Sequence, residues 1–176
     1  MTKKLNIKII AIIVAACLSV ALIAAAIAIS LENERAENAA PSFTVVDARG
    51  RSVELSSIRN KPVIVNFWAT WCRYCLEEMP AFEEAYREYG DDIVFMMVNM
   101  TEGDETVARA KAFIADAGYT FPIYFDENGD AATTYRISSL PMTLFINRDG
   151  SLYTSHTGML YKDSLENYID HLLEKP

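Results

Sequence analysis

The chain has 176 residues and a formal net charge of −8 at pH 7. The first 31 residues contain three lysines and no acidic residue, so the remainder holds 13 of the 16 basic and all 24 acidic residues, a formal charge of −11. An acidic remainder without a basic cluster argues against nucleic-acid binding. Three cysteines are too few for a disulfide scaffold, which favours a redox or metal role.

Residues 9–31 contain no charged side chain and are rich in Ala, Ile, Val and Leu. That length suffices for a helix that crosses the hydrocarbon core of a bilayer. The lysines all precede this segment, whereas Arg35 is the only basic residue in the flank that follows it. By the positive-inside rule we expect residues 1–8 in the cytoplasm, an uncleaved single-pass anchor, and the rest of the chain outside a bacterial cell membrane.

Two other interpretations of this segment remain open. A cleaved signal peptide has a shorter apolar region, although the small residues at 39–40 leave cleavage feasible. Val14–Cys17 resembles the lipobox of a lipoprotein, but the chain stays apolar well beyond Cys17, where a lipoprotein has a polar tether. All three interpretations place the domain outside the cytoplasm.

Residues 32–41 are short and polar and predict a linker, followed by one folded domain over residues 42–176. Two β-branched runs around the turn signal at 47–50 predict an N-terminal β-hairpin. The near-continuous apolar runs 62–68 and 93–98 are typical of strands that are buried on both faces.

The rest of the domain predicts a second hairpin and three helices. The hairpin joins strands over 143–146 and 152–157. Apolar residues at helical spacing predict helices from Leu76 to Tyr86, from Val107 to Ala117 and from Leu165 to Leu172, the second with Asp104 as its N-cap and Gly118 as its stop. This order of elements predicts an α/β fold with a mixed central sheet flanked by helices.

Cys72 and Cys75 are three residues apart at the start of the first predicted helix, so they share a face and can close a small disulfide. Unpaired N–H groups and the positive end of the helix dipole stabilise a thiolate at this position. The thiolate is the attacking species in thiol–disulfide exchange, so we expect Cys72 to be the nucleophile and the more buried Cys75 to be the resolving thiol. Trp71 is expected to pack against the pair and limit its exposure.

Two alternatives to redox chemistry are weaker. A structural disulfide between such close residues closes only a tiny loop and contributes little stability. A zinc site needs about four ligands, and beside this pair the chain offers only His156 and His171. We therefore expect no metal and no cofactor.

The run VIVNFWATWCRYC, followed far downstream by Ser139–Thr143 before an apolar strand, resembles thioredoxin-fold proteins. The apolar N-terminal segment, Asn66 in the first core strand and the CLEEMP continuation are most similar to the TlpA/ResA-like branch, whose members are membrane-anchored, extracytoplasmic thiol-disulfide oxidoreductases of bacteria. The segment 101–125, with its extra helix, is similar to an insertion shared with AhpC/TSA-type (peroxiredoxin-like) folds. The resemblance covers residues 42–176.

The resemblance implies roles for several residues. Pro141 matches the family's cis-proline, and the backbone of Leu140 beside it would pair with an extended substrate in a groove that Trp71 also borders. Glu78 matches an acidic residue that moves protons to and from the thiols, although a solvated helix glutamate is the alternative. Asn66 replaces the buried aspartate of cytoplasmic thioredoxins, which raises the expected importance of Glu78.

The dipeptide between the cysteines, Arg73-Tyr74, lacks the proline that many relatives have there. A neighbouring cation favours the thiolate, so we expect Arg73, Tyr74 and Asn66 to tune the redox potential.

The resemblance implies a protein-disulfide reductase whose Cys72–Cys75 pair is a redox-active disulfide. Its substrates would be exported proteins with disulfides, such as apocytochrome c or other envelope proteins, and a membrane electron donor of the CcdA/DsbD type would re-reduce it. Three alternatives remain: a thiol oxidase or isomerase, a copper-delivery protein using the cysteines and His156, and, weakest, a peroxidase.

Overall fold

The structure, a computed structural model, describes residues 7–58 and 60–174. It divides into two compact units, the first ending at Asn38 and the second beginning at Ala39. In the first unit, helix α1 (Ile7–Asn38) contains a stretch, Ile9–Glu32, that is long and apolar enough to cross a membrane. Residues 32–38, predicted as part of a linker, belong to this helix.

The second unit begins three residues before the predicted domain boundary. The backbone of Ala39 forms a β-bridge with Ser151, and the Ala40 N–H donates to the Gly150 carbonyl over 2.9 Å. The Tyr135 hydroxyl donates to the Pro41 carbonyl over 2.7 Å. These bonds make the end of the predicted linker part of the folded domain.

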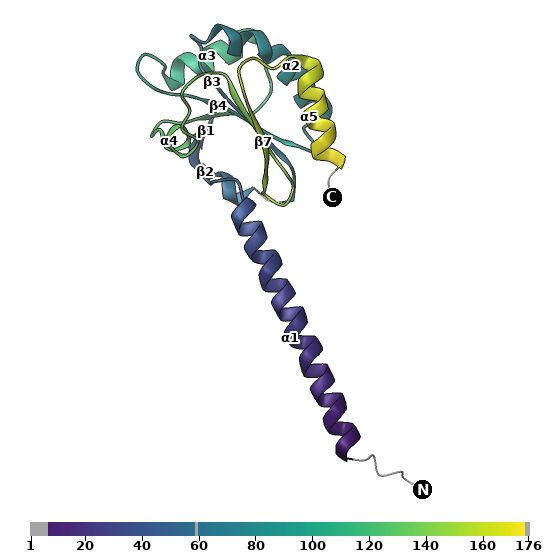
Figure 1. The fold of residues 1–176 in the computed structure, drawn as a ribbon. Helices are drawn as coiled ribbons and strands as arrows, with labels where there is room; N and C mark the ends of the chain where they lie inside the picture. Colours follow the sequence, from purple (N-terminus) through teal and green to yellow (C-terminus); the bar gives the residue numbers. More distant parts are fainter. Residues whose placement is uncertain (1–6, 59, 175–176) are drawn as a thin grey trace. The chain divides into compact units, whose positions relative to one another are not determined.

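The domain is built on one mixed seven-stranded sheet with the strand order β2-β1-β5-β4-β3-β6-β7 (Figure 1). β3 is parallel to β4 and antiparallel to β6. Both predicted hairpins are confirmed as the antiparallel pairs β1–β2 and β6–β7. The strands are β1 (Thr44–Asp47), β2 (Ser52–Glu54), β3 (Val63–Trp68), β4 (Val94–Asn99), β5 (Ile123–Phe125), β6 (Met142–Ile146) and β7 (Leu152–Thr157).

Alternation along the central strands divides the core into two layers. On β3, Ile64 and Trp68 belong to one hydrophobic cluster, whereas Val65 and Phe67 belong to the other. The first cluster also contains buried residues of α2, α3 and α5, and the second contains Phe43 and a residue of α4. The helices are α2 (Arg73–Tyr89), α3 (Val107–Ala117), α4 (Asp130–Thr134) and α5 (Lys162–Glu174), with a 3-10 turn η1 (Leu55–Ser57).

This arrangement confirms the predicted thioredoxin-like α/β fold, in which a central sheet is flanked by helices. The short elements β5, α4 and η1 were not predicted. Each has only three to five residues, too few to show periodicity by itself, whereas the equally short β1 and β2 were recognised with the help of the turn signal between them.

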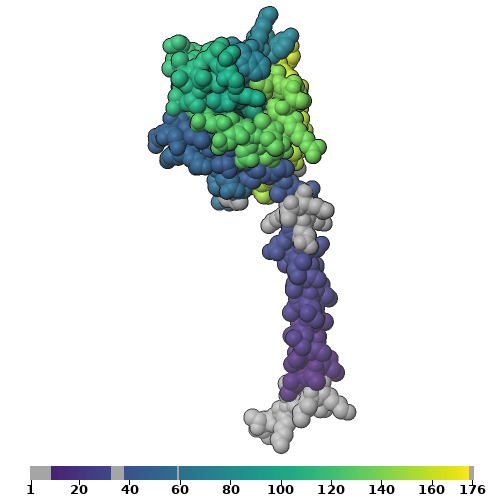
Figure 2. All heavy atoms as spheres, turned by 90° about the vertical axis from the view of Figure 1, so that its left-hand side faces the viewer, coloured from purple at the N-terminus to yellow at the C-terminus, as the bar shows by residue number. Residues whose placement is uncertain are grey.

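The segment between β4 and β6 holds α3, β5 and α4, and its green atoms cover much of the domain face shown in Figure 2. The N-cap of α3 is Thr106, whose side chain accepts from the Arg109 N–H, so the prediction of Asp104 as the cap is wrong by two residues. The helix stops at Gly118 as predicted, where a φ of +71° favours a residue without a Cβ.

Candidate active site

Cys72 and Cys75 form a disulfide at the start of α2. Cys72 is the N-cap residue of this helix, and its Sγ accepts from the Cys75 N–H over 3.2 Å. Cys75 is fully buried and Cys72 is 6% exposed, the order of burial expected for a resolving and an attacking thiol. An N–H aimed at Sγ stabilises negative charge on Cys72, so the helix start favours its thiolate.

Pro141 lies at the same edge of the sheet as the cysteine pair. The Leu140–Pro141 peptide bond is cis, the conformation that the resemblance implied. The next residue, Met142, pairs with Phe67 near the end of β3, and the chain continues from β3 through a three-residue loop to Cys72. The antiparallel pairing of β3 and β6 therefore brings two segments that are distant in sequence to one edge.

Glu78 lies behind the pair, on the buried face of α2 one turn after Cys75, and it is only 1% exposed. Its Oε1 accepts from Asn66 Nδ2 over 2.8 Å, and its Oε2 accepts from the Leu160 N–H over 2.7 Å. The alternative of a solvated glutamate does not agree with this burial. Leu160 was not recognised from the sequence, since a backbone donor from a distant loop leaves no side-chain signal.

Burial raises the pKa of Glu78 to about 7, because removal from water penalises the charged carboxylate more than its two hydrogen bonds stabilise it. A carboxyl group with a pKa near 7 exchanges its proton readily at neutral pH. Glu78 can therefore both accept and donate a proton near the thiols.

Asn66 is the part of this network contributed by the sheet. It is 1% exposed, and its Nδ2 also donates to Thr143 Oγ1 over 3.0 Å, across the β3–β6 pair. Its Oδ1 is buried and has no hydrogen-bond partner among the residues that the structure describes. Thr143 was not singled out from the sequence, although the predicted pairing of the two strands could have indicated it.

The residues around Cys72 are more exposed than the pair itself. Trp71 is 63% exposed, so most of its side chain faces solvent, whereas Cys72 beside it is buried. Tyr74 is similarly exposed, at 61%. The guanidinium of Arg73 donates to Glu77 over 2.7 Å, and this hydrogen bond, together with the charge of the carboxylate, raises the pKa of Arg73.

An open groove of about 450 Å³ borders Trp71. One wall comes from the loop after β4 and another from the segment that leads to Pro141, so the groove lies beside the cysteine pair. Its lining residues are Trp71, Met100, Glu102, Gly103, Ala132, Ile137, Ser138, Ser139 and Leu140.

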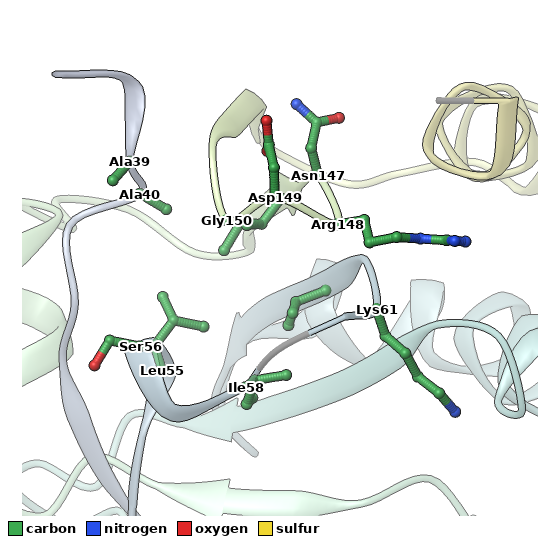
Figure 3. A pocket seen from close by; sticks show the side chains of 12 residues that line it. Ala39, Ala40, Leu55, Ser56, Ile58, Lys61, Asn147, Arg148, Asp149 and Gly150 are labelled. Carbon is green, nitrogen blue, oxygen red and sulfur yellow. The ribbon is translucent and has the colours of Figure 1, made fainter. Parts of the chain in front are cut away.

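A second cavity, of about 240 Å³, lies at the opposite ends of β3 and β6, between Ala40, Leu55, Ile58 and the β6–β7 turn (Figure 3). Lys61 and Arg148 extend to the same side of it (Figure 3). Because β3 begins at this edge and leads to Cys72 at the other, the cavity is remote from the redox pair.

Within residues 7–58 and 60–174, no three His, Cys, Asp or Glu side chains are grouped closely enough to hold a metal ion. His156 is half-buried on β7, opposite Thr143, with its ring 6.5 Å from that of Tyr168. The copper alternative needs His156 and both cysteines together, and these three residues form no such group in the described part of the chain.

A disulfide at a helix N-terminus, beside a cis-proline and a buried proton-exchanging carboxyl on a thioredoxin-like fold, defines a thiol-disulfide oxidoreductase. The comparison with known families agrees: the AhpC/TSA family profile matches residues 36–155, and the chain belongs to that family.

Among its relatives, the thiol-disulfide oxidoreductase ResA of Bacillus thuringiensis subsp. konkukian (strain 97-27) is 35% identical over 130 residues, 74% of each chain. The thioredoxin-like protein YneN of Bacillus subtilis (strain 168) is 34% identical over 131 residues, 74% of this chain and 76% of that one. The crystal structure of the exposed lipoprotein thioredoxin Etrx1 of Streptococcus pneumoniae strain TIGR4 is similar with a TM-score of 0.65 and 30% identity, over 74% of this chain and 99% of that one. The protein is an oxidoreductase of the ResA type.

Proposed function

We propose that this oxidoreductase is tethered to the outer face of a bacterial cell membrane and reduces disulfides in exported proteins. The observation that carries the proposal is Glu78, a buried carboxyl with a pKa of about 7, one helical turn behind Cys75. A resolving thiol has to lose its proton before it can attack, and this carboxyl is the nearby group able to take it at neutral pH.

The reaction has two exchange steps. The Cys72 thiolate attacks one sulfur of the substrate disulfide, forming a mixed disulfide and releasing one substrate thiolate, which takes up a proton. Glu78 accepts the proton of Cys75, whose thiolate attacks Cys72 Sγ, breaks the mixed disulfide and releases the second substrate thiolate. Two electrons pass to the substrate, and the enzyme is left with its Cys72–Cys75 disulfide.

The substrate would approach from the side of the exposed aromatic residues. Trp71 and Tyr74 border Cys72, and the groove beside Trp71 continues to Leu140, the residue before Pro141. Large exposed apolar side chains mark interaction surfaces, and the backbone of Leu140 would pair with an extended chain. An exported protein with an accessible disulfide, such as apocytochrome c or another envelope protein, suits this surface.

A pair that works in an oxidising compartment needs a source of electrons. We propose a membrane donor of the CcdA/DsbD type, which passes two electrons to the Cys72–Cys75 disulfide and regenerates the dithiol. The reduction potential of the full chain in detergent tests the direction of flux: a value near that of thioredoxin, about −270 mV, supports a reductase, whereas one near −120 mV supports the oxidase or isomerase alternative.

For the membrane tether we propose residues 1–8 as a cytoplasmic end, 9–31 as a single-pass anchor, 32–41 as the connection and 42–176 as the extracytoplasmic domain. The apolar stretch Ile9–Glu32 and the lysines before it support this assignment. Since the pneumococcal relative is a lipoprotein, lipidation at Cys17 is the specific alternative. A wild-type chain that stays in the membrane fraction at full length supports the helical anchor, whereas a wild-type chain shortened to begin at Cys17, and restored to full length by Cys17→Ala, supports lipidation.

The decisive test is capture of a substrate. In a Cys17→Ala background, Cys75→Ser should accumulate a mixed disulfide on Cys72 when the reduced full-length chain meets an exported protein with a disulfide. Adding Cys72→Ser is the matched control and should capture nothing. If Cys75→Ser captures no substrate and the wild-type chain cannot reduce a peptide disulfide, the proposal fails.

A further inference from the structure

The segment between β4 and β5 is bound to the active-site loop through a buried carboxylate, Glu105, which lies outside the network around Glu78. Its side chain is 0% exposed. Oε1 accepts from the Thr70 N–H over 2.8 Å and from Asn99 Nδ2 over 2.7 Å, and Oε2 accepts from the Thr70 hydroxyl over 2.6 Å. Both donors of Thr70 are therefore committed to one carboxylate.

Thr70 is the middle residue of the loop that joins the end of β3 to Cys72. Thr70 is a central residue of the turn that closes through the Cys72 N–H, which donates to the Ala69 carbonyl over 3.1 Å. Fixing Thr70 therefore fixes the backbone immediately before the nucleophile and the base of the exposed Trp71.

Glu105 is itself held by the start of α3. It directly precedes the N-cap residue Thr106, and its N–H donates to the Glu102 carbonyl over 3.1 Å. Arg109, one turn into the helix, places Nε 3.9 Å from Oε2. Glu105 thus lies in a hydrogen-bonded turn directly before the capped end of α3.

The chemistry of this contact requires a carboxylate. An ionised glutamate is an acceptor only, so it can meet three donors at once. Glutamine has one carbonyl oxygen and turns its NH₂ group toward another donor, which leaves a buried N–H or O–H unpaired. Glu105→Gln therefore breaks part of this contact while keeping the size of the side chain.

We propose that Glu105 is a positioning residue for the oxidoreductase reaction: through Thr70 it holds the loop that carries Cys72, so that Sγ stays aligned for attack when the disulfide to Cys75 is open. The covalent bond restrains Cys72 in the oxidised protein, whereas in the dithiol its placement depends on non-covalent contacts such as this one. The inference rests on the reductase chemistry proposed above.

The test compares two reactions of the Cys72 thiolate in the reduced full-length chain in detergent. Attack on a peptide disulfide demands an aligned sulfur, whereas alkylation by iodoacetamide mainly reports how much thiolate is present. Both rates are measured against pH up to their plateaus, where the thiol is fully ionised. We expect Glu105→Gln to lower the plateau rate of disulfide attack about ten-fold and to leave the alkylation plateau within about two-fold.

Glu83 provides a matched control, because it binds Thr120 in the same way, through the N–H over 2.7 Å and the hydroxyl over 2.6 Å, but Thr120 follows α3 in the chain and is not part of the active-site loop. Glu83→Gln should lower the melting temperature about as much as Glu105→Gln and leave disulfide attack within about two-fold of wild type. Equal slowing by both variants, or attack by Glu105→Gln at the wild-type plateau rate, overturns the proposal.

Changes at Thr70 keep the test informative if Glu105→Gln does not fold. Thr70→Val removes only the hydroxyl donor and should slow disulfide attack about three-fold, while Thr70→Ser keeps both donors and should restore the wild-type rate. No slowing by Thr70→Val overturns the positioning role. A wild-type chain that fails to reduce the peptide overturns the proposed function instead, so the two failures are distinguishable.

Discussion

Glu78 and Glu83 lie five residues apart on the same helix and are both buried, yet the pKa values of their carboxyl groups are shifted in opposite directions. Burial raises the pKa of Glu78 to about 7. At Glu83 burial also acts to raise the pKa, but hydrogen bonds from Thr120, Arg87 and Phe121 together outweigh it, and the pKa is lowered. The two sites differ mainly in how many donors each carboxylate meets.

Glu78 meets two donors, whereas Glu83 meets four. A buried carboxylate with four donors, one of them a guanidinium, stays charged and fastens the end of the inserted segment to α2. A buried carboxylate with two donors is left close to its ionisation midpoint at neutral pH. Helix α2 therefore carries one carboxylate suited to structure and one suited to proton exchange.

The largest effect is expected on stability at Glu83. Glu83→Ala leaves the N–H groups of Thr120 and Phe121, the Thr120 hydroxyl and Arg87 without their shared acceptor, and should lower the free energy of unfolding by about 4 kcal/mol. Urea unfolding of the oxidised full-length chain in detergent, followed by tryptophan fluorescence, measures it. A loss below about 1 kcal/mol would show that Glu83 is not the structural carboxylate of the pair.

At Glu78 we expect an effect on the pH dependence of stability. Since its folded pKa of about 7 exceeds the unfolded value of 4.5, the folded state holds the extra proton, and wild-type stability is lost as pH rises from about 4.5 to 7. Glu78→Gln has no proton to lose at this position. The free energy of unfolding of the variant minus that of wild type should therefore rise by roughly 3 kcal/mol between pH 4 and pH 8. A pH-independent difference would contradict the raised pKa.

In catalysis the same substitution should be harmful. Glu78→Gln cannot take the proton of Cys75, and we expect the release of substrate from the mixed disulfide to slow about ten-fold or more at pH 7. Raising the pH should restore much of the loss, because Cys75 then ionises without help. Single-turnover release against pH measures this, with Glu77→Gln, an exposed neighbour on α2, as the control that should follow wild type.

The smallest effect is expected at Asn66. Asn66→Ala removes one of the two donors to Glu78 and should raise its pKa further, by about one unit or less. Infrared absorption of the protonated carboxyl against pH measures the shift. Thr143→Val is the control, because Thr143 accepts a hydrogen bond from Asn66 and leaves the bond from Asn66 to Glu78 in place. An unchanged midpoint in Asn66→Ala would remove Asn66 from the proton network.

The parts of the fold that could be predicted are those with strong periodicity. The apolar runs of β3, β4 and β6 and the stripe on α2 are long enough to indicate their elements, and the Cys72–Cys75 spacing at a helix start indicates the chemistry. The sequence could not decide whether Glu78 is buried or exposed. Its position on the helix allows both, and only the loop that contains Leu160 covers it.

The remaining site residues depend on contacts between distant segments. Thr143 becomes relevant through the register of β6 on β3, and Glu105 through the approach of the α3 start to Thr70. Glu105 belongs to no local motif, and the run Ser139–Thr143 does not by itself indicate that Thr143 meets Asn66. The position of Trp71 also depends on such contacts: an aromatic residue beside a buried pair suggests packing, and only the surrounding loops show that the side chain also borders a groove.

The two tryptophans of the chain form a built-in pair of optical probes. Trp68 is fully buried, whereas Trp71, three residues on, is 63% exposed at the edge of the reacting sulfurs. A water-soluble quencher such as iodide would therefore dim Trp71 selectively and leave the emission of Trp68 as an internal reference. Arrival of a substrate over the groove would shield Trp71 from the quencher, so the encounter could be timed in the unlabelled protein before any sulfur bond changes.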